Sequence, residues 1–179
     1  KQLPSVVSFL EMYNVGKIEQ LNIANRWMLN NSKKTLGVPV GIEKSGSLLK
    51  LDLHEKFHGP HGLIAGMTGS GKSEFIITYI LSLAVNYSPD DVAFILIDYK
   101  GGGLALAFEN KTTGVTLPHL AGTITNLDKA EMDRTLVSID SEVRRRQRIF
   151  NEARDKLGES TIDIYKYQKF YRDGKLEDP

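Results

Sequence analysis

The octapeptide "GMTGSGKS", Gly66–Ser73, constrains the fold more than any other stretch of this 179-residue chain. It matches the pattern G-x-x-x-x-G-K-[ST] at every fixed position. The apolar segment "HGLIA" before it has the character of a strand, and the apolar run "FIITYILSLAV" after it has that of a helix. A strand, a glycine-rich loop and a helix in this order predict a phosphate-binding loop inside an α/β fold.

The composition of this loop suits it to surround a phosphate group. Glycine lets the backbone turn tightly, so that successive N–H groups face inward, and the N-terminus of the following helix adds positive potential. We expect Lys72 to reach the β- and γ-phosphates of ATP and the Ser73 hydroxyl to bind Mg²⁺. The residues expected to surround the nucleotide phosphates are Gly66, Met67, Thr68, Gly69, Ser70, Gly71, Lys72 and Ser73. The alternative is a glycine-rich turn without a ligand.

Beyond this loop, strand patterns alternate with helix patterns. In chain order we expect a strand at 62–65, a helix at 73–87, a strand at 92–98, a short helix at 104–109, a strand at 121–125 and a long helix at 129–156. Such alternation is typical of a parallel sheet covered by helices on both faces.

The two ends of the chain follow other patterns. Near the start, helical segments are predicted at 9–14 and 18–30, followed by a hairpin around the turn sequence "KSGS" that leads into the strand at 62–65. Near the end, the aromatic stretch from Tyr165 to Tyr171 is predicted to form a helix that packs on its neighbour, against the alternative of a surface that stacks nucleic-acid bases.

Composition narrows the class of protein. The 23 Lys and Arg residues nearly balance the 22 Asp and Glu residues, so net charge does not favour binding of nucleic acid by bulk phosphate neutralisation. Since the chain has no cysteine, it has no disulfide framework and no Cys-ligated metal site. Its longest apolar run is about half of the ~20 residues that a membrane-spanning helix needs. Because the chain starts with "KQLPSVV", without an initiator Met or a signal segment, we expect a piece of a longer polypeptide.

The decapeptide "FILIDYKGGG", residues 94–103, is an apolar run that ends in an acidic residue. Such a run often marks the Mg²⁺-binding strand of a nucleotide-hydrolysing enzyme. Asp98 is followed by Tyr99 and not by a second acid, although hydrolysis needs a carboxylate that orients water. Two interpretations stay open, a structural or indirect role for Asp98 and direct contact with Mg²⁺. Lys100 and the three glycines form a candidate loop for coupling the nucleotide state to a neighbouring subunit.

The predicted helix at 129–156 has an apolar stripe, which is expected to be core. The stripe consists of Met132, Leu136, Ile139, Val143 and Phe150. At ~100° per residue, Arg145 lies nearly opposite the stripe, Arg148 lies on the outer side and Arg146 falls at its boundary.

An arginine of this helix is a candidate for acting on a neighbouring subunit's nucleotide. In ring ATPases, an arginine presented to the γ-phosphate stabilises the charge of the transition state. Arg145 is the candidate for this trans arginine, with Arg146 or Arg148 as substitutes. The competing interpretation is a solvated basic face whose members pair with Glu142, Glu152 and Asp155.

The histidines are assigned structural roles. His119 stands among apolar residues in "LPHLAG" and is expected to be packed and hydrogen-bonded. The segment "HEKFHGPH", with His54, His58 and His61, matches the letters of the zinc-protease pattern HExxH. The Gly-Pro pair after His58 breaks the helix that this pattern requires, so a loop leading into the nucleotide strand is favoured over a zinc site.

Four phrases in a fixed order resemble a known family: "HGLIAGMTGSGKS", "FILIDYKGGGLALAF", "LPHLAGTITNLD" and "RRRQRIF". They resemble the FtsK/SpoIIIE family of hexameric translocase ATPases, and within it the EssC/EccC branch of type VII secretion. The prelude "FLEMYNV…NRW…PVGI…LDLHEKFHGPHG" also resembles that branch, so the resemblance covers almost the whole chain. The letters NKxD and LSGGQ, expected of GTPases and ABC transporters, do not occur.

The resemblance implies a fold. It is a RecA-like, three-layer P-loop NTPase domain with a parallel central sheet, truncated before the Walker B strand. The hydrolytic Asp-Glu pair would lie beyond Pro179, so the fragment alone is expected to bind ATP without hydrolysing it. Residues 1–50 would form N-terminal helices and a hairpin packed on the ATPase core, and residues 51–179 would form the N-terminal part of the FtsK/SpoIIIE-type ATPase domain.

The resemblance also implies a function. The parent protein would be a membrane-anchored motor ATPase that uses ATP and Mg²⁺ to drive type VII protein secretion, with this module on the cytoplasmic side of the cell membrane. Its partners would be neighbouring ATPase domains and subunits of a hexameric ring, small helical secreted proteins and other membrane components of the secretion machine. Two alternatives stay open, a DNA translocase of the same family and a non-hydrolysing nucleotide-binding assembly module. Duplex DNA is not expected as a partner.

Overall fold

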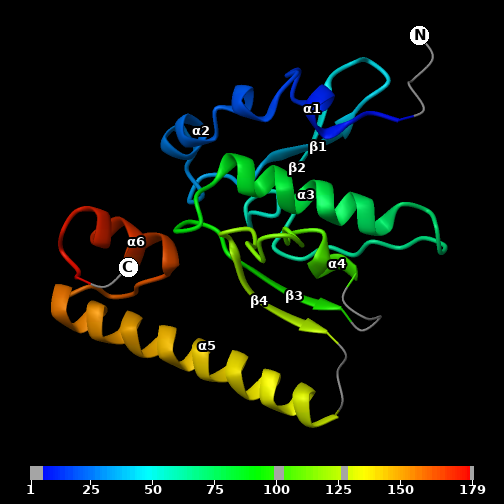
Figure 1. Cartoon of the computed structure of the whole chain (residues 1–179). Helices are drawn as coiled ribbons and strands as arrows, with labels where there is room; N and C mark the ends of the chain where they lie inside the picture. Colours follow the sequence, from blue (N-terminus) through cyan, green and yellow to red (C-terminus); the bar gives the residue numbers. More distant parts are fainter. Residues whose placement is uncertain (1–5, 99–102, 126–128, 178–179) are drawn as a thin grey trace. The chain divides into compact units, whose positions relative to one another are not determined.

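The computed structural model describes residues 6–98, 103–125 and 129–177, with the backbone alone for 129–132 (Figure 1). The chain divides into two compact units, Lys1–Asn126 and Leu127–Pro179, and each is described by itself. The elements in chain order are α1 (Phe9–Met12), the 3₁₀ turn η1 (Ile18–Leu21), α2 (Ile23–Leu29), β1 (Val38–Ile42), β2 (Leu48–Leu51), α3 (Lys72–Asn86), β3 (Phe94–Asp98), α4 (Gly103–Leu106), β4 (Leu120–Thr125), α5 (Lys129–Leu157) and α6 (Ile164–Arg172).

The N-terminal segment is helical, as predicted, but in shorter pieces. Helix α1 begins with a reciprocal capping box, in which the Ser8 hydroxyl accepts from the Glu11 N–H and the Glu11 carboxylate accepts from the Ser8 N–H. The helix expected at 18–30 is wrong as a single element. Asn22 has a φ of 50°, in the left-handed region that asparagine tolerates, and divides it into η1 and α2.

The predicted hairpin is confirmed by the antiparallel pairing of β1 with β2. Its attachment to α3 combines apolar and polar contacts. Val38 is fully buried against Leu83 and Tyr87 of the same cluster, and the Ser82 hydroxyl donates to the carbonyl oxygen of Pro39 at 2.7 Å. These contacts hold the hairpin against α3. The division of the chain at residue 50 stays a prediction.

A parallel pair of strands, β3 and β4, confirms the predicted α/β alternation in this part of the chain. One face of the pair packs toward α3 and α4 through a cluster of Ile80, Leu96 and Phe108. The strand predicted at 62–65 is wrong for the described residues, because that segment has no strand pairing there and Leu63 is 94% exposed. A strand forms only where a neighbour pairs with its backbone N–H and C=O groups.

The second unit consists of α5 and α6. Side chains of both helices form a cluster with Leu176, in which Ala153, Tyr167 and Phe170 are buried. The ring of Phe150 lies 5.2 Å from that of Tyr167. The prediction that the terminal aromatic stretch packs as a helix on its neighbour is therefore confirmed.

The predicted core stripe of α5 is wrong over much of its length. Leu136, Ile139 and Val143 are exposed within this unit, while Phe150 is half-buried and the Met132 side chain lies outside the described residues. Helix α6 and the segments beside it cover only the C-terminal part of α5, which has 29 residues. Periodicity reveals which face of a helix is apolar, but it does not reveal how far a partner extends.

Candidate phosphate-binding site

Two glycines of the loop Gly66–Ser73 are required by its conformation, and a third, Gly66, lies close to the Ser70 side chain. Gly69 and Gly71 have φ values of 81° and 88°, a region that glycine enters without strain. At Gly66, an added Cβ would lie 2.6 Å from the hydroxyl oxygen of Ser70, so the Ser70 side chain would have to rotate away. Gly69 and Gly71 therefore make a tight turn that residues with a side chain could adopt only with strain.

The lysine of the loop is the first residue of α3. Its Nζ donates to the carbonyl oxygens of Gly66 and Met67 at 2.7 and 2.6 Å, so the ammonium group lies over the loop itself. A phosphate bound in the loop would be attracted by the positive charge of the same ammonium group. The six residues before it, Gly66, Met67, Thr68, Gly69, Ser70 and Gly71, are exposed to solvent.

The N-terminal end of α3 is open. Gly71 occupies the N-cap position, and among the described residues no side chain caps the first turn. The first N–H groups of a helix have no partner inside the helix, so this end presents donors and positive potential to an anion. Ser73, in the same turn, is exposed and carries the hydroxyl expected to bind Mg²⁺. These donors and this hydroxyl fit a nucleotide phosphate with its metal.

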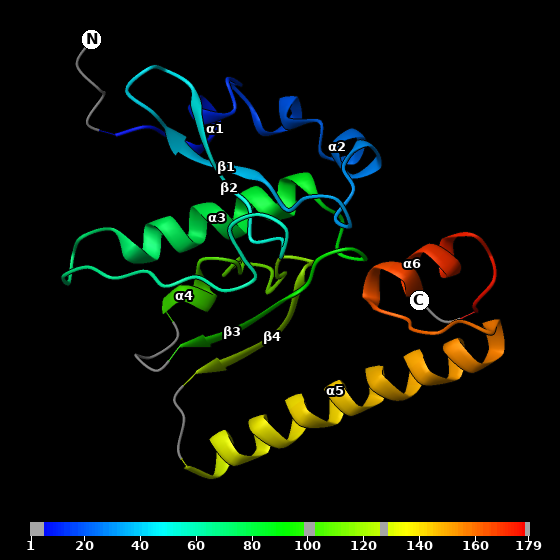
Figure 2. The same cartoon turned by 180° about the vertical axis from the view of Figure 1, so that it is seen from behind.

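The loop lies at the edge of the sheet where ligands of α/β proteins bind. The N-terminal end of α3 and the carboxyl ends of β3 and β4 lie on the same side of the first unit, as Figure 1 and the reverse view in Figure 2 show. Ligands of open α/β sheets bind outside the carboxyl ends of the strands. This edge is called the nucleotide edge below.

Asp98 is the last residue of β3 and lies at this edge. Its Oδ2 atom accepts from the backbone N–H of Leu104, in α4, at 3.3 Å. The residues that follow it, Tyr99 to Gly102, lie outside the described part, so the prediction for Lys100 and its glycines is not addressed. The carboxylate has a structural partner.

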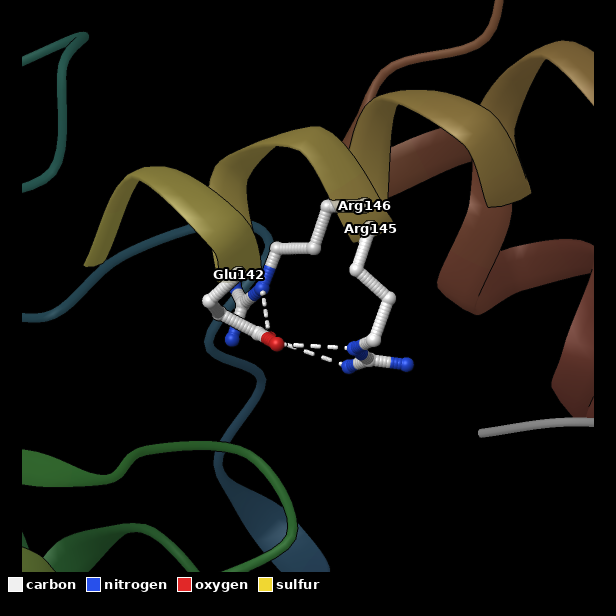
Figure 3. Close-up of polar contacts among 3 residues, drawn as sticks. All are labelled: Glu142, Arg145 and Arg146. Carbon is white, nitrogen blue, oxygen red and sulfur yellow. Dashed lines mark hydrogen bonds and ion pairs between the residues drawn. The ribbon is translucent and has the colours of Figure 1, made fainter. Parts of the chain in front are cut away.

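Arg145, the candidate trans arginine, forms ion pairs on the surface of α5 (Figure 3). Its Nε and Nη2 atoms donate to the two carboxylate oxygens of Glu142 at 2.7 and 2.9 Å, and Arg146 donates to the same carboxylate at 2.8 Å. Hydrogen bonds from Arg145, which has the larger effect, and from Arg146 lower the pKa of Glu142 to about 2.

The remaining arginines of this face are paired as well. Arg148 lies 3.8 Å from Glu152, and Arg154 lies 2.8 Å from Asp155. The structure therefore contains the paired basic face that was the competing interpretation, with all three predicted acidic partners engaged. The assignment of Arg145 as a trans arginine stays a prediction.

The prediction that His119 is packed and hydrogen-bonded is confirmed. It is 2% exposed, and its Nε2 atom lies 2.7 Å from the carbonyl oxygen of Tyr87. The rings of Trp27 and Phe94 lie 5.6 and 6.1 Å from its ring.

His54 and His58 belong to a loop around a buried carboxylate that sequence reasoning missed. Asp52 accepts hydrogen bonds from the Thr35 hydroxyl at 2.5 Å and from the backbone N–H groups of Leu36 and His54, both at 2.9 Å. Burial raises the pKa of Asp52, but these hydrogen bonds outweigh burial and hold it below its usual value. His58 accepts from the Asp52 N–H. In the described part of the chain, no group of three or more His, Asp or Glu side chains is arranged to hold a metal ion.

Asp52 could not be found from the sequence because two of its donors are backbone groups and the third, the Thr35 hydroxyl, lies 17 positions away. Only the Asp-His pair at 52 and 54, after a strand pattern, could have suggested a side chain that turns back onto the chain. Trp27 escaped for the same reason, since its indole N–H donates to a carbonyl oxygen of α3.

The fold and the loop define a nucleotide-binding domain of the RecA-like P-loop class. The family model of FtsK/SpoIIIE matches residues 21–171, and the chain belongs to the FtsK/SpoIIIE family. It is 50% identical over 99% of its length to the type VII secretion system protein EssC of Staphylococcus aureus, and 47% identical over 98% to the ESX secretion system protein YukB of Bacillus subtilis. It spans 11% of the length of each of these relatives.

A solved structure has the same fold. The chain resembles the cytoplasmic domain of the type VII secretion ATPase EccC of Thermomonospora curvata, with a TM-score of 0.68 and 28% sequence identity, over 98% of this chain and 20% of that one. The predicted family and fold class are confirmed. In the described part of the chain, none of the helices is both long enough and apolar enough to cross a membrane.

Proposed function

We propose that this chain is the ATP-binding part of a membrane-anchored motor ATPase that drives type VII protein secretion. One observation carries the proposal: the loop Gly66–Ser73 combines two conformationally required glycines, Gly69 and Gly71, with an open helix end and Lys72 at its start. Membership of the FtsK/SpoIIIE family supports nucleotide binding, and the names of the relatives support the secretion role.

Within this proposal each residue of the loop has a role. The backbone N–H groups of the loop and of the first turn of α3 bind phosphate oxygens. Lys72 leaves the carbonyl oxygens of Gly66 and Met67 and neutralises charge on the β- and γ-phosphates. The Ser73 hydroxyl provides a ligand to Mg²⁺, which neutralises further phosphate charge.

Binding of ATP is tested with Lys72→Ala in the full-length protein. We expect the variant to lose measurable affinity for Mg·ATP in isothermal titration calorimetry, because the loop then lacks its cationic side chain. Lys44→Ala is the matched control, since Lys44 is an exposed lysine in the hairpin turn of the same unit. Unchanged ATP affinity in the Lys72 variant would refute the assignment of the phosphate loop.

Hydrolysis in the parent protein needs groups beyond this loop. We propose that a carboxylate pair outside this chain orients the attacking water, and that Arg145 acts on the nucleotide of a neighbouring subunit in a hexameric ring. Replacing Arg145 with Ala in the full-length protein should then lower steady-state ATPase activity. Arg144→Ala is the control, because Arg144 lies on the same helix and pairs with Asp140 in a similar way. Equal activity of both variants and the wild type would remove Arg145 from this role.

The proposal extends to partners and location. The module acts on the cytoplasmic side of the cell membrane, with neighbouring ATPase domains, other membrane components of the secretion machine and small helical secreted proteins as partners. The nearly balanced charge of the chain argues against duplex DNA as the substrate. Stimulation of ATPase activity by duplex DNA, weakening as salt rises, would instead identify a DNA translocase. ATP binding without turnover in the full-length protein would identify an assembly module.

A further inference from the structure

We propose that Asp98 is a positioning residue that fixes α4 at the nucleotide edge, and that its carboxylate does not bind the metal. The sequence leaves the role of Asp98 open. Its relevance to the nucleotide rests on the proposed function, whereas the contact itself does not.

A hydrogen bond joins Asp98 to α4. The Oδ2 atom of Asp98 accepts from the Leu104 N–H at 3.3 Å, across six positions of the chain. Leu104 is the second residue of α4, and the first N–H groups of a helix have no acceptor within the helix. A helix of only four residues makes few internal bonds, so an acceptor from β3 contributes much of what holds its first turn in place.

Helix α4 packs on the same apolar cluster as α3, the helix that follows the phosphate loop. Leu104 packs against the cluster of Ile80, Leu96 and Phe108, as Ile76 does. Ile76 lies in the first half of α3, one turn after Lys72. Asp98 therefore holds a segment that packs on the same cluster as the start of α3, and a displaced α4 would disturb the support under the loop.

A helix cap and a metal ligand differ in their need for negative charge. A neutral amide oxygen accepts from a backbone N–H nearly as a carboxylate does, so asparagine can replace aspartate as a cap. A Mg²⁺ ligand, direct or through water, depends on the negative charge. Asp98→Asn and Asp98→Ala therefore separate the two roles, because asparagine preserves the cap and alanine removes it.

The cap is tested by hydrogen exchange, which needs no nucleotide. In the full-length protein, we expect the Leu104 amide to exchange about 5-fold faster in Asp98→Ala and within about 2-fold of wild type in Asp98→Asn. Asp90→Ala, at an exposed aspartate of the same unit, should leave this exchange unchanged. If Leu104 exchanges equally fast in wild type and Asp98→Ala, or if Asp98→Asn matches Asp98→Ala, the inference is refuted.

The metal role is tested by titrating Mg²⁺ at fixed ATP. We expect Asp98→Asn to bind Mg·ATP with the wild-type Mg²⁺ requirement, and Asp98→Ala to show a raised KM for ATP that Asp98→Asn restores. A Mg²⁺ requirement raised about 10-fold in Asp98→Asn would identify a metal ligand and refute the inference. If neither wild type nor variants bind ATP, the proposed function fails, and the exchange of Leu104 still decides whether Asp98 is the cap.

Discussion

The two long helices of this protein, α3 and α5, are stabilised in different ways. Helix α3 contacts apolar clusters of the first unit, and side chains outside the helix donate to two of its C-terminal carbonyl groups. Helix α5 is nearly twice as long, but only its C-terminal part packs in its own unit, and its surface carries short-range ion pairs. Packing and hydrogen bonds hold α3, whereas the uncovered part of α5 carries exposed ion pairs, whose contribution is expected to be small.

The two ends of α3 differ as well. At the C-terminal end, the indole N–H of Trp27 donates to the carbonyl oxygen of Ala84 at 2.9 Å, and the amide of Asn30 donates to that of Asn86 at 2.9 Å. The N-terminal end has no such partners among the described residues and is exposed. The closed end therefore provides stability, and the open end is available to a ligand.

The largest effect is expected at the closed end of α3. Trp27→Ala should lower the free energy of unfolding by about 2–3 kcal/mol, below the range for a fully buried tryptophan because Trp27 is half-buried. The loss has two parts, apolar contact and the hydrogen bond to Ala84, and urea denaturation monitored by circular dichroism measures their sum.

Trp27→Phe separates these parts. It keeps an aromatic ring but removes the hydrogen bond and part of the apolar contact, so it should cost about 1–2 kcal/mol, less than Trp27→Ala. Neither variant should change ATP affinity more than about 2-fold, because Trp27, in α2, contacts the C-terminal end of α3, which is opposite to the phosphate loop. An equal loss of stability in both variants would show that ring packing contributes little.

The second effect concerns the open end. Gly71→Ala should cost about 1–2 kcal/mol, because alanine at a φ of 88° is strained although an added Cβ meets no atom within 4 Å. It should also weaken ATP binding, since the strained loop will relax away from its phosphate-binding shape.

Gly46→Ala is a closely matched control for this variant. Gly46 has a φ of 92°, and an added Cβ there also meets no atom within 4 Å. It lies in the hairpin turn, so it should cost similar stability and leave ATP affinity unchanged. Calorimetric titration of both variants decides the point. If Gly46→Ala weakens ATP binding as much as Gly71→Ala, the effect comes from general destabilisation and not from the loop.

Sequence patterns predicted the local features of the first unit well. The phosphate-loop motif gave the position of α3, and period-two patterns gave the hairpin and β4, because these features depend on residues close together in the chain. The prediction of a strand at 62–65 was wrong because a strand forms only where a neighbouring strand pairs with its backbone N–H and C=O groups. The prediction of one helix at 18–30 was wrong because the apolar periodicity of a helix continues across Asn22, although this residue is left-handed and divides the helix.

The residues of the candidate site also fall into two groups, those that could be predicted from local sequence and those that could not. The glycines of the loop could be predicted because their conformation is local. The contact of Asp98 with α4 and the network around Asp52 could not, because each joins a side chain to a backbone group that any residue provides. The acidic partners of the basic face were predictable, since they lie within four positions of their arginines.

The smallest effect is expected from the ion pairs of α5. Hydrogen bonds from Arg145 and Arg146 lower the pKa of Glu142 to about 2 from its ordinary value of 4.5. A depressed pKa means that the contribution of this carboxylate to stability is present above pH 4.5 and is lost as the pH falls through about 2. Because the pair is exposed, the effect should be slight and should weaken in salt.

Acid titration of α5 helicity measures this contribution. Comparing wild type with Glu142→Gln by circular dichroism between pH 5 and about pH 2, we expect helicity to fall more in the wild type, since glutamine has no charge to lose. Lys156→Ala, in the last turn of the same helix, should leave the titration as in wild type. If wild type and Glu142→Gln titrate identically, the ion pairs do not stabilise α5. The exposed N-terminal half of α5 would then depend on contacts outside its own unit. Helix α3, in contrast, is held by contacts within its own unit.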